Sequence, residues 1–168
     1  MEFTRETVVN ASIEQAWDIL GNQYTAAYKW ASGLKYSEGE GAPQFEGAVC
    51  NNRACDTTIL GAIKEEIRIF DPVNHVLSYE VIEGFPFFVK LGQNTWTLTR
   101  IGNQTKVSMR LEMRTKGVIG KVMSPMMRLQ MGGVLTNAIE DFKHYVETGR
   151  PSPRKAKEIA KEAKKKAA

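Results

Sequence analysis

The 168-residue sequence lacks most of the features that place a chain outside the ordinary globular class. It has no apolar run of the roughly 18 residues needed to cross a bilayer. The first ten residues include Glu2, Arg5 and Glu6 and lack the apolar core of a signal peptide. With 42% hydrophobic and 25% charged residues, the composition is that of a folded domain. We therefore expect one cytoplasmic domain with at most a short appendage.

Cysteine is scarce, and the motifs of nucleotide and nucleophile chemistry are missing. Cys50 and Cys55 are the only cysteines, and no second cysteine pair or histidine cluster completes a zinc site. We interpret both as reduced thiols, because disulfides are rare in the cytosol. The two could face each other across a hairpin if the chain were exported. Without a P-loop, a dinucleotide-binding glycine motif or a nucleophile elbow, the sequence requires no metal and no cofactor.

Positive charge is concentrated at the C-terminus. Residues 150–168 contain eight basic and two acidic residues, whereas residues 1–149 contain 15 basic and 17 acidic residues. The tail therefore carries a net charge of +6 and the body −2. Nucleic-acid binding by the body is not expected. We predict a frayed, solvated helix for the tail, and a further hypothesis is that this tail contacts an anionic membrane or partner.

Predicted helices lie before and after a long region of predicted strands. Residues 3–9 predict a strand, and apolar residues behind the N-cap Ser12 predict a helix that ends at Gly21. A second short helix is expected at 24–30. Between residues 34 and 115, turn signals separate strands without an intervening helix. This pattern favours an antiparallel sheet.

The last element before the tail is a long helix. Gly117 begins a helical region, and Ser124-Pro125 has the form of an N-cap followed by proline at the first helical position. Gly149 and Pro151 end the helix. Gly132-Gly133 lies inside it, where each glycine costs about 1 kcal/mol relative to alanine. Such a pair suggests a close backbone approach, a bend, or space left for another molecule.

This order of elements, with about six strands after the two short helices, resembles the helix-grip superfamily. That superfamily (SRPBCC) includes START-like lipid-transfer domains, Bet v 1-like proteins and polyketide cyclase/dehydrase-like proteins. The resemblance rests on VVNASIEQAW (8–17), GAV (47–49), IKEEIRIFDP (63–72), LSYEV (77–81) and the segment 137–146. It implies an α+β fold in which an antiparallel sheet of about seven strands wraps around the long C-terminal helix. It also implies a cavity between them for a sterol, lipid, hormone or polyketide-like molecule.

Two polar positions bear on how such a ligand is held. Many relatives place an arginine after the opening glycine of the third strand, where this chain has Cys50. The polar anchor is therefore missing or has moved to Arg53. Glu65 alternates with Ile63, Ile67 and Ile69, which predicts that all four side chains point inward. A carboxylate among isoleucines is costly unless it is paired or protonated. Glu65 is thus a ligand anchor, a general acid/base, or half of a structural pair, for example with Arg53; a shifted register, in which Glu65 does not point inward, is the remaining alternative.

Methionine and aromatic side chains supply the candidate cavity wall, although each is equally suited to ordinary core packing. Methionine adapts to irregular ligands, and tyrosine and tryptophan offer an apolar body with one polar group. The predicted ligand-binding residues are Trp30, Glu65, Tyr79, Phe87, Phe88, Trp96, Met109, Met127, Met131 and Leu135.

These observations lead to two functional hypotheses. The favoured one is binding or transport of a small hydrophobic molecule by residues 1–149, as a monomer or a homodimer, with residues 150–168 as a basic tail. The alternative is a cyclase or dehydratase that acts on a polyketide-like substrate in the same cavity. In that case Glu65 would move a proton and Tyr79 would stabilise an enolate.

Overall fold

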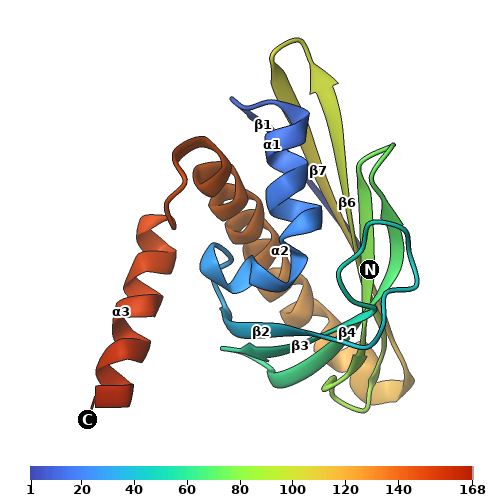
Figure 1. The fold of residues 1–168 in the computed structure, drawn as a ribbon. Coiled ribbons are helices and arrows are strands. Elements are labelled where there is room, and N and C mark those ends of the chain that lie inside the picture. Colours follow the sequence, from blue (N-terminus) through green and yellow to red (C-terminus); the bar gives the residue numbers. More distant parts are fainter. Residues whose placement is uncertain (168) are drawn as a thin grey trace.

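In the computed structural model, which describes residues 1–167, the strands form one antiparallel sheet in the order β1-β7-β6-β5-β4-β3-β2 (Figure 1). The predicted α+β helix-grip fold is confirmed, with a sheet of seven strands curved around one long helix. The strands are β1 (Glu2–Val9), β2 (Leu34–Glu40), β3 (Asn52–Thr57), β4 (Gly61–Asp71), β5 (Val76–Glu83), β6 (Val89–Ile101) and β7 (Gln104–Thr115).

Alternation sets the two faces of the sheet in β7, whereas a bulge interrupts it in β4. In β7, Val107, Met109 and Met113 are buried, while Arg110 is exposed. In β4, Ile67 is buried but Ile69 is 43% exposed, so the prediction that Ile69 points inward is wrong. A bulge opposite β5 between these two residues shifts the alternation, and Phe70 is buried instead.

The two short helical segments after β1 form where the sequence predicts them. The first consists of α1 (Ile13–Trp17) and the π-helical turn η1 (Asp18–Asn22), and the second is the 3₁₀ helix η2 (Tyr24–Lys29). The N-cap predicted at Ser12 is present and forms a capping box, because the Gln15 backbone amide donates to Ser12 Oγ and the Ser12 backbone amide donates to Gln15 Oε1. Trp17 then packs on Phe70 with a ring separation of 5.3 Å, which joins this segment to the sheet.

The long helix α2 (Gly117–Thr148) begins seven residues before Ser124, so the predicted N-cap is wrong. Pro125 lies inside the helix, and the Ser124 hydroxyl donates to the Gly120 carbonyl at 2.8 Å instead of capping. The helix starts earlier because Gly117 adopts a φ of +70° after the extended Lys116 and turns the chain out of β7. It ends at Gly149, which is left-handed as predicted for a C-cap glycine. None of the helices in residues 1–167 combines the length and apolar character needed to cross a membrane.

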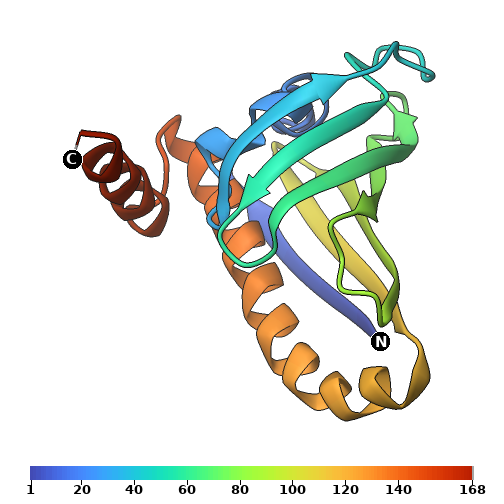
Figure 2. The ribbon, with the colours of Figure 1, turned by 90° about the horizontal axis from the view of Figure 1, so that it is seen from below.

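Only the C-terminal half of α2 is seated in a filled core. Leu135, Ile139 and Phe142 are buried there. Phe142 contacts Trp30 and Trp96, with ring centroids 5.2 and 5.5 Å away. Figure 2 shows α2 running along the open side of the curved sheet, with the last helix beyond its C-terminal end. The first half of α2, in contrast, does not pack on a filled core.

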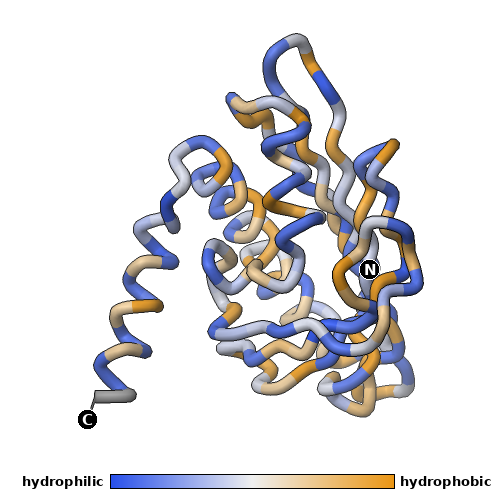
Figure 3. The backbone as a smooth tube through the Cα atoms, in the orientation of Figure 1, coloured by the Kyte–Doolittle hydropathy of each residue, from blue (hydrophilic) through white to orange (hydrophobic). Residues whose placement is uncertain are grey.

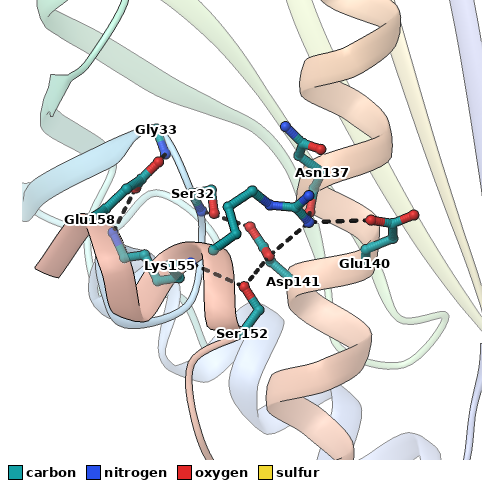
Figure 4. Close-up of polar contacts among 9 residues, drawn as sticks. Ser32, Gly33, Asn137, Glu140, Asp141, Ser152, Lys155 and Glu158 are labelled. Carbon is teal, nitrogen blue, oxygen red and sulfur yellow. Dashed lines mark hydrogen bonds and ion pairs between the residues drawn. The ribbon is translucent and has the colours of Figure 1, made fainter.

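The tail forms helix α3 (Pro153–Ala167), and its first turns are docked rather than frayed. In Figure 4, Asp141 on α2 accepts hydrogen bonds from the Ser152 hydroxyl, the Arg154 guanidinium and the Ser32 amide. Lys155 is 2% exposed and donates to the Leu34 carbonyl at 2.6 Å. The expectation of a wholly solvated tail is therefore wrong at its start. Further along α3, hydrophilic stretches alternate with shorter hydrophobic ones (Figure 3).

Candidate ligand-binding cavity

A cavity of about 520 Å³ lies between the first half of α2 and the inner face of the sheet. It exists because α2 packs most closely on β1 and β7, while the remaining strands curve away from it. Its volume is within the range of roughly 300–1,000 Å³ that is typical of small-molecule sites. Six of the seven methionines line it, namely Met109, Met113, Met123, Met126, Met127 and Met131.

The structure brings nine of the ten predicted ligand-binding residues into this one wall. They are Trp30, Glu65, Tyr79, Phe88, Trp96, Met109, Met127, Met131 and Leu135. The prediction of Phe87 is wrong, because its side chain is 72% exposed and lies outside the cavity. Phe85 takes its place and packs against Gly92, where a Cβ atom would lie only 2.4 Å from the ring. Gly84, with a φ of +95°, sets the direction of this loop.

Polar side chains from four adjacent strands form one row across the inner face. Arg53 on β3 is opposite Glu65 on β4, and Tyr79 on β5 is opposite Asn94 on β6. All four line the cavity. Because most of the rest of the wall is apolar, this row is suited to recognise a polar group of a ligand.

A buried ion pair forms the centre of the row. Arg53 Nη2 and Nε lie 2.6 and 2.8 Å from Glu65 Oε2, and Arg53 Nη1 donates to the Tyr24 carbonyl at 2.7 Å. The guanidinium stacks over the Tyr24 ring at 3.9 Å. Desolvation opposes the charge of Arg53, but the neighbouring Glu65 carboxylate raises the pKa of the guanidinium above its usual value. Arg53 is therefore a permanent cation in the wall, and Glu65 is its partner.

Tyr79 presents a hydroxyl proton that the protein leaves without an acceptor. Its oxygen accepts hydrogen bonds from Asn94 Nδ2 at 2.9 Å and Trp96 Nε1 at 3.3 Å. Among the described residues, no acceptor receives the proton of this hydroxyl. Desolvation, followed by the Glu65 charge, raises the pKa of Tyr79, so the phenol stays protonated. It is therefore a hydrogen-bond donor in the cavity wall.

Four further buried polar atoms of lining residues lack a hydrogen-bond partner within residues 1–167, and two of them are the Ser32 hydroxyl and Arg154 Nε. The other two are the Trp30 Nε1 donor and the Asn94 Oδ1 acceptor. Leaving such a group unpaired costs about 1–3 kcal/mol. A bound molecule that reached either atom would recover part of this cost.

The cysteines are free and buried, and they do not supply a nucleophile. Cys55 Sγ donates to Glu65 Oε2 at 3.6 Å. Desolvation, and secondarily the Glu65 carboxylate, raises the pKa of the Cys55 thiol to about 12. The thiol therefore stays protonated at neutral pH and is unreactive there. Cys50 precedes β3 rather than lying on a strand.

Several lining residues were not among the predicted site residues, notably Tyr24, Arg53, Phe85 and Asn94. The sequence identified Arg53 as a possible partner of Glu65 and as the position to which the polar anchor could have moved. Asn94 alternates with the inward-facing Trp96, so the period of two on β6 is the signal that would have found it. No comparable signal marks Tyr24, which lies on a 3₁₀ helix.

The chain belongs to a known protein family. The family model described as "Polyketide cyclase / dehydrase and lipid transport" matches residues 1–147, which is most of the chain. No curated protein is significantly similar to it in sequence.

Solved structures share the fold at low sequence identity. A START superfamily protein from Mycobacterium smegmatis is 15% identical, with a TM-score of 0.70 over 86% of this chain and 96% of that one. A protein from Thermus thermophilus is 14% identical, with a TM-score of 0.67 over 87% and 97%. Norcoclaurine synthase from Thalictrum flavum, solved with dopamine and hydroxybenzaldehyde, is 17% identical, with a TM-score of 0.65 over 87% and 86%. The likeness confirms the helix-grip fold that the sequence predicted.

Proposed function

We propose that this protein binds a small, mostly apolar molecule in the cavity and holds the polar end of that molecule at the Arg53-Glu65-Tyr79 row. The observation that carries the proposal is a mostly apolar, methionine-lined cavity that has a row of polar side chains on four adjacent strands of its wall. Membership of a family that includes lipid transport proteins agrees with it.

The donor of Tyr79 defines the polar group that the ligand should carry. A carbonyl, ether or carboxylate oxygen would accept its proton, and the permanent charge of Arg53 close by favours a partial or full negative charge. The rest of the ligand would contact methionine and tryptophan side chains. Each Å² of apolar surface buried contributes roughly 25 cal/mol before ordering costs. Affinity would thus come from the apolar wall and orientation from the polar row.

Tryptophan fluorescence offers a direct test, because Trp30 and Trp96 lie in the wall and no label is needed. The protein would be titrated with fatty acids, sterols and polyketide-like aromatic ketones. We expect saturable quenching or a spectral shift with at least one of them. In Met127→Trp, a larger side chain enters the cavity, and binding should be lost. The matched control, Val73→Trp, places the same side chain on an exposed turn and should leave binding unchanged.

A polyketide cyclase or dehydratase is the second candidate, because a carboxylate and a phenol occur in the same wall. Glu65 would then move a proton and Tyr79 would stabilise the enolate. However, Glu65 accepts hydrogen bonds from Arg53, which favours a positioning role for this carboxylate. Turnover of a polyketide-like ketone that Glu65→Gln abolishes without loss of binding would establish the enzyme. Binding without turnover would support the carrier.

A further inference from the structure

The first half of α2 is apolar on both sides. One side faces the cavity through Met123, Met127 and Met131. The opposite side carries Val118, Val122 and Leu129, which are 77%, 71% and 82% exposed. A helix that is apolar all round is normally buried all round. The exposed side therefore has the apolar composition of a contact surface, but no other part of residues 1–167 covers it.

The neighbouring loop extends this apolar surface. The Lys116 amide donates to the Phe88 carbonyl at 2.8 Å, which fixes the β5–β6 loop beside the start of α2. Figure 1 shows this loop and the N-terminal end of α2 together at one end of the molecule. Phe87, which the cavity does not use, is exposed on that loop. We call the surface formed by Phe87, Val118, Val122 and Leu129 the apolar end.

Basic side chains surround the apolar end. Between residues 84 and 139 the chain has eight basic residues and a single acidic one, Glu112, although residues 1–149 are −2 overall. Four of the basic residues lie at the start of β6, directly before α2 or on the first half of α2, and no carboxylate within residues 1–167 forms an ion pair with any of them. They are Lys90, Lys116, Lys121 and Arg128.

We infer that the apolar end docks on an anionic membrane surface, with its aliphatic and aromatic side chains in the interface and its basic rim on lipid phosphates. Exposed apolar residues on one side of a helix, flanked by lysine and arginine, are the composition of interfacial helices. A second copy of this chain is a poorer partner, because a two-fold contact would bring two basic rims together. An acidic protein is also less suited, since the side chains protrude from a helix and form no groove.

This docking places the cavity next to the bilayer. Met126 is half-exposed on the outer side and also lines the cavity, and Phe85 and Phe88 close the same end from the loop. An apolar ligand could pass between membrane and cavity here without crossing water. The inference rests on the proposed function only for this consequence, because the surface itself needs no ligand.

Vesicle co-sedimentation of the full chain tests the inference. We expect binding to vesicles of phosphatidylcholine mixed with phosphatidylglycerol, weakened by added salt, and little binding to phosphatidylcholine alone. Val122→Gln/Leu129→Gln and Lys121→Gln/Arg128→Gln should each weaken binding by at least about tenfold. All four side chains are exposed, so the variants should keep the far-UV spectrum of the wild type.

Two controls keep the test specific. Val73→Gln changes an equally exposed apolar residue at the opposite end of β5 and should bind like the wild type. Lys157→Gln/Lys161→Gln removes charge from the tail and should cost much less than the α2 pair. Absence of binding to anionic vesicles, binding that Val122→Gln/Leu129→Gln leaves intact, or a dimer that this variant dissociates would overturn the inference. Because none of these residues lines the cavity, ligand titrations of the same variants report on the proposed function separately.

Discussion

Replacing Glu65 with leucine should destabilise the fold strongly. The side chains of Arg53 and Glu65 are only 5% and 9% exposed, and two guanidinium nitrogens lie within 2.8 Å of Glu65 Oε2. Without the carboxylate, Arg53 remains a buried cation with only the Tyr24 carbonyl and two aromatic rings around it. Breaking a buried pair in this way costs about 3–5 kcal/mol of the free energy of unfolding.

Urea unfolding of a double-mutant cycle measures this cost. Arg53→Met and Glu65→Leu should each be destabilising, while the double variant should lose at least about 2 kcal/mol less than the sum, because it buries no unpaired charge. The exposed pair of Arg68 and Glu80, 2.9 Å apart, is the matched control and should couple by less than about 1 kcal/mol. Additive effects at Arg53 and Glu65, or a cost below about 1 kcal/mol for Glu65→Leu, would refute the reasoning.

Three further predictions follow from single side chains. Asp141→Ala should lower the free energy of unfolding by about 2–3 kcal/mol and expose the segment after Gly149 to proteases, because several buried donors lose their acceptor. Stability should fall as the pH rises above 9, because the thiol of Cys55 ionises near 9.0 in the unfolded chain but only near 12 in the folded one. Up to about 4 kcal/mol is lost across that window, and Cys55→Ala should lose less in urea titrations over the same pH range. In the fluorescence titration, Phe85→Ala should weaken ligand binding about tenfold, whereas Phe87→Ala should leave it unchanged.

The sequence predicted the fold well wherever one residue type decides a local structure. Ser12 identified the start of α1, and Gly149 identified the end of α2. The predictions of Ile69 and of the Ser124 N-cap failed because tertiary contacts decide both. Ile69 is as apolar as Ile67, and only the pairing of β4 with β5 reveals the bulge. Ser124-Pro125 is a favourable N-cap sequence, but α2 begins earlier, at the turn formed by Gly117.

The candidate site was predictable in composition but less so in orientation. Inward alternation placed Glu65 in the wall, and the ion pair with Arg53 required the β3–β4 register. In the β5–β6 loop, no periodicity distinguishes Phe85, which faces the cavity, from Phe87, which faces solvent. Counting net charge only for residues 1–149 and 150–168 also concealed the basic residues near the apolar end, since acidic residues elsewhere in residues 1–149 cancel their charge.

Native mass spectrometry of the purified protein, with extraction of what co-purifies, tests the central claim most directly. We expect one apolar molecule per chain, either carried through purification or taken up from offered lipids and aromatic ketones. It should be held more weakly by Tyr79→Phe and excluded by Met127→Trp. A protein that arrives empty and stays empty with every class offered would contradict the account, and the cavity would then have no ligand-binding role.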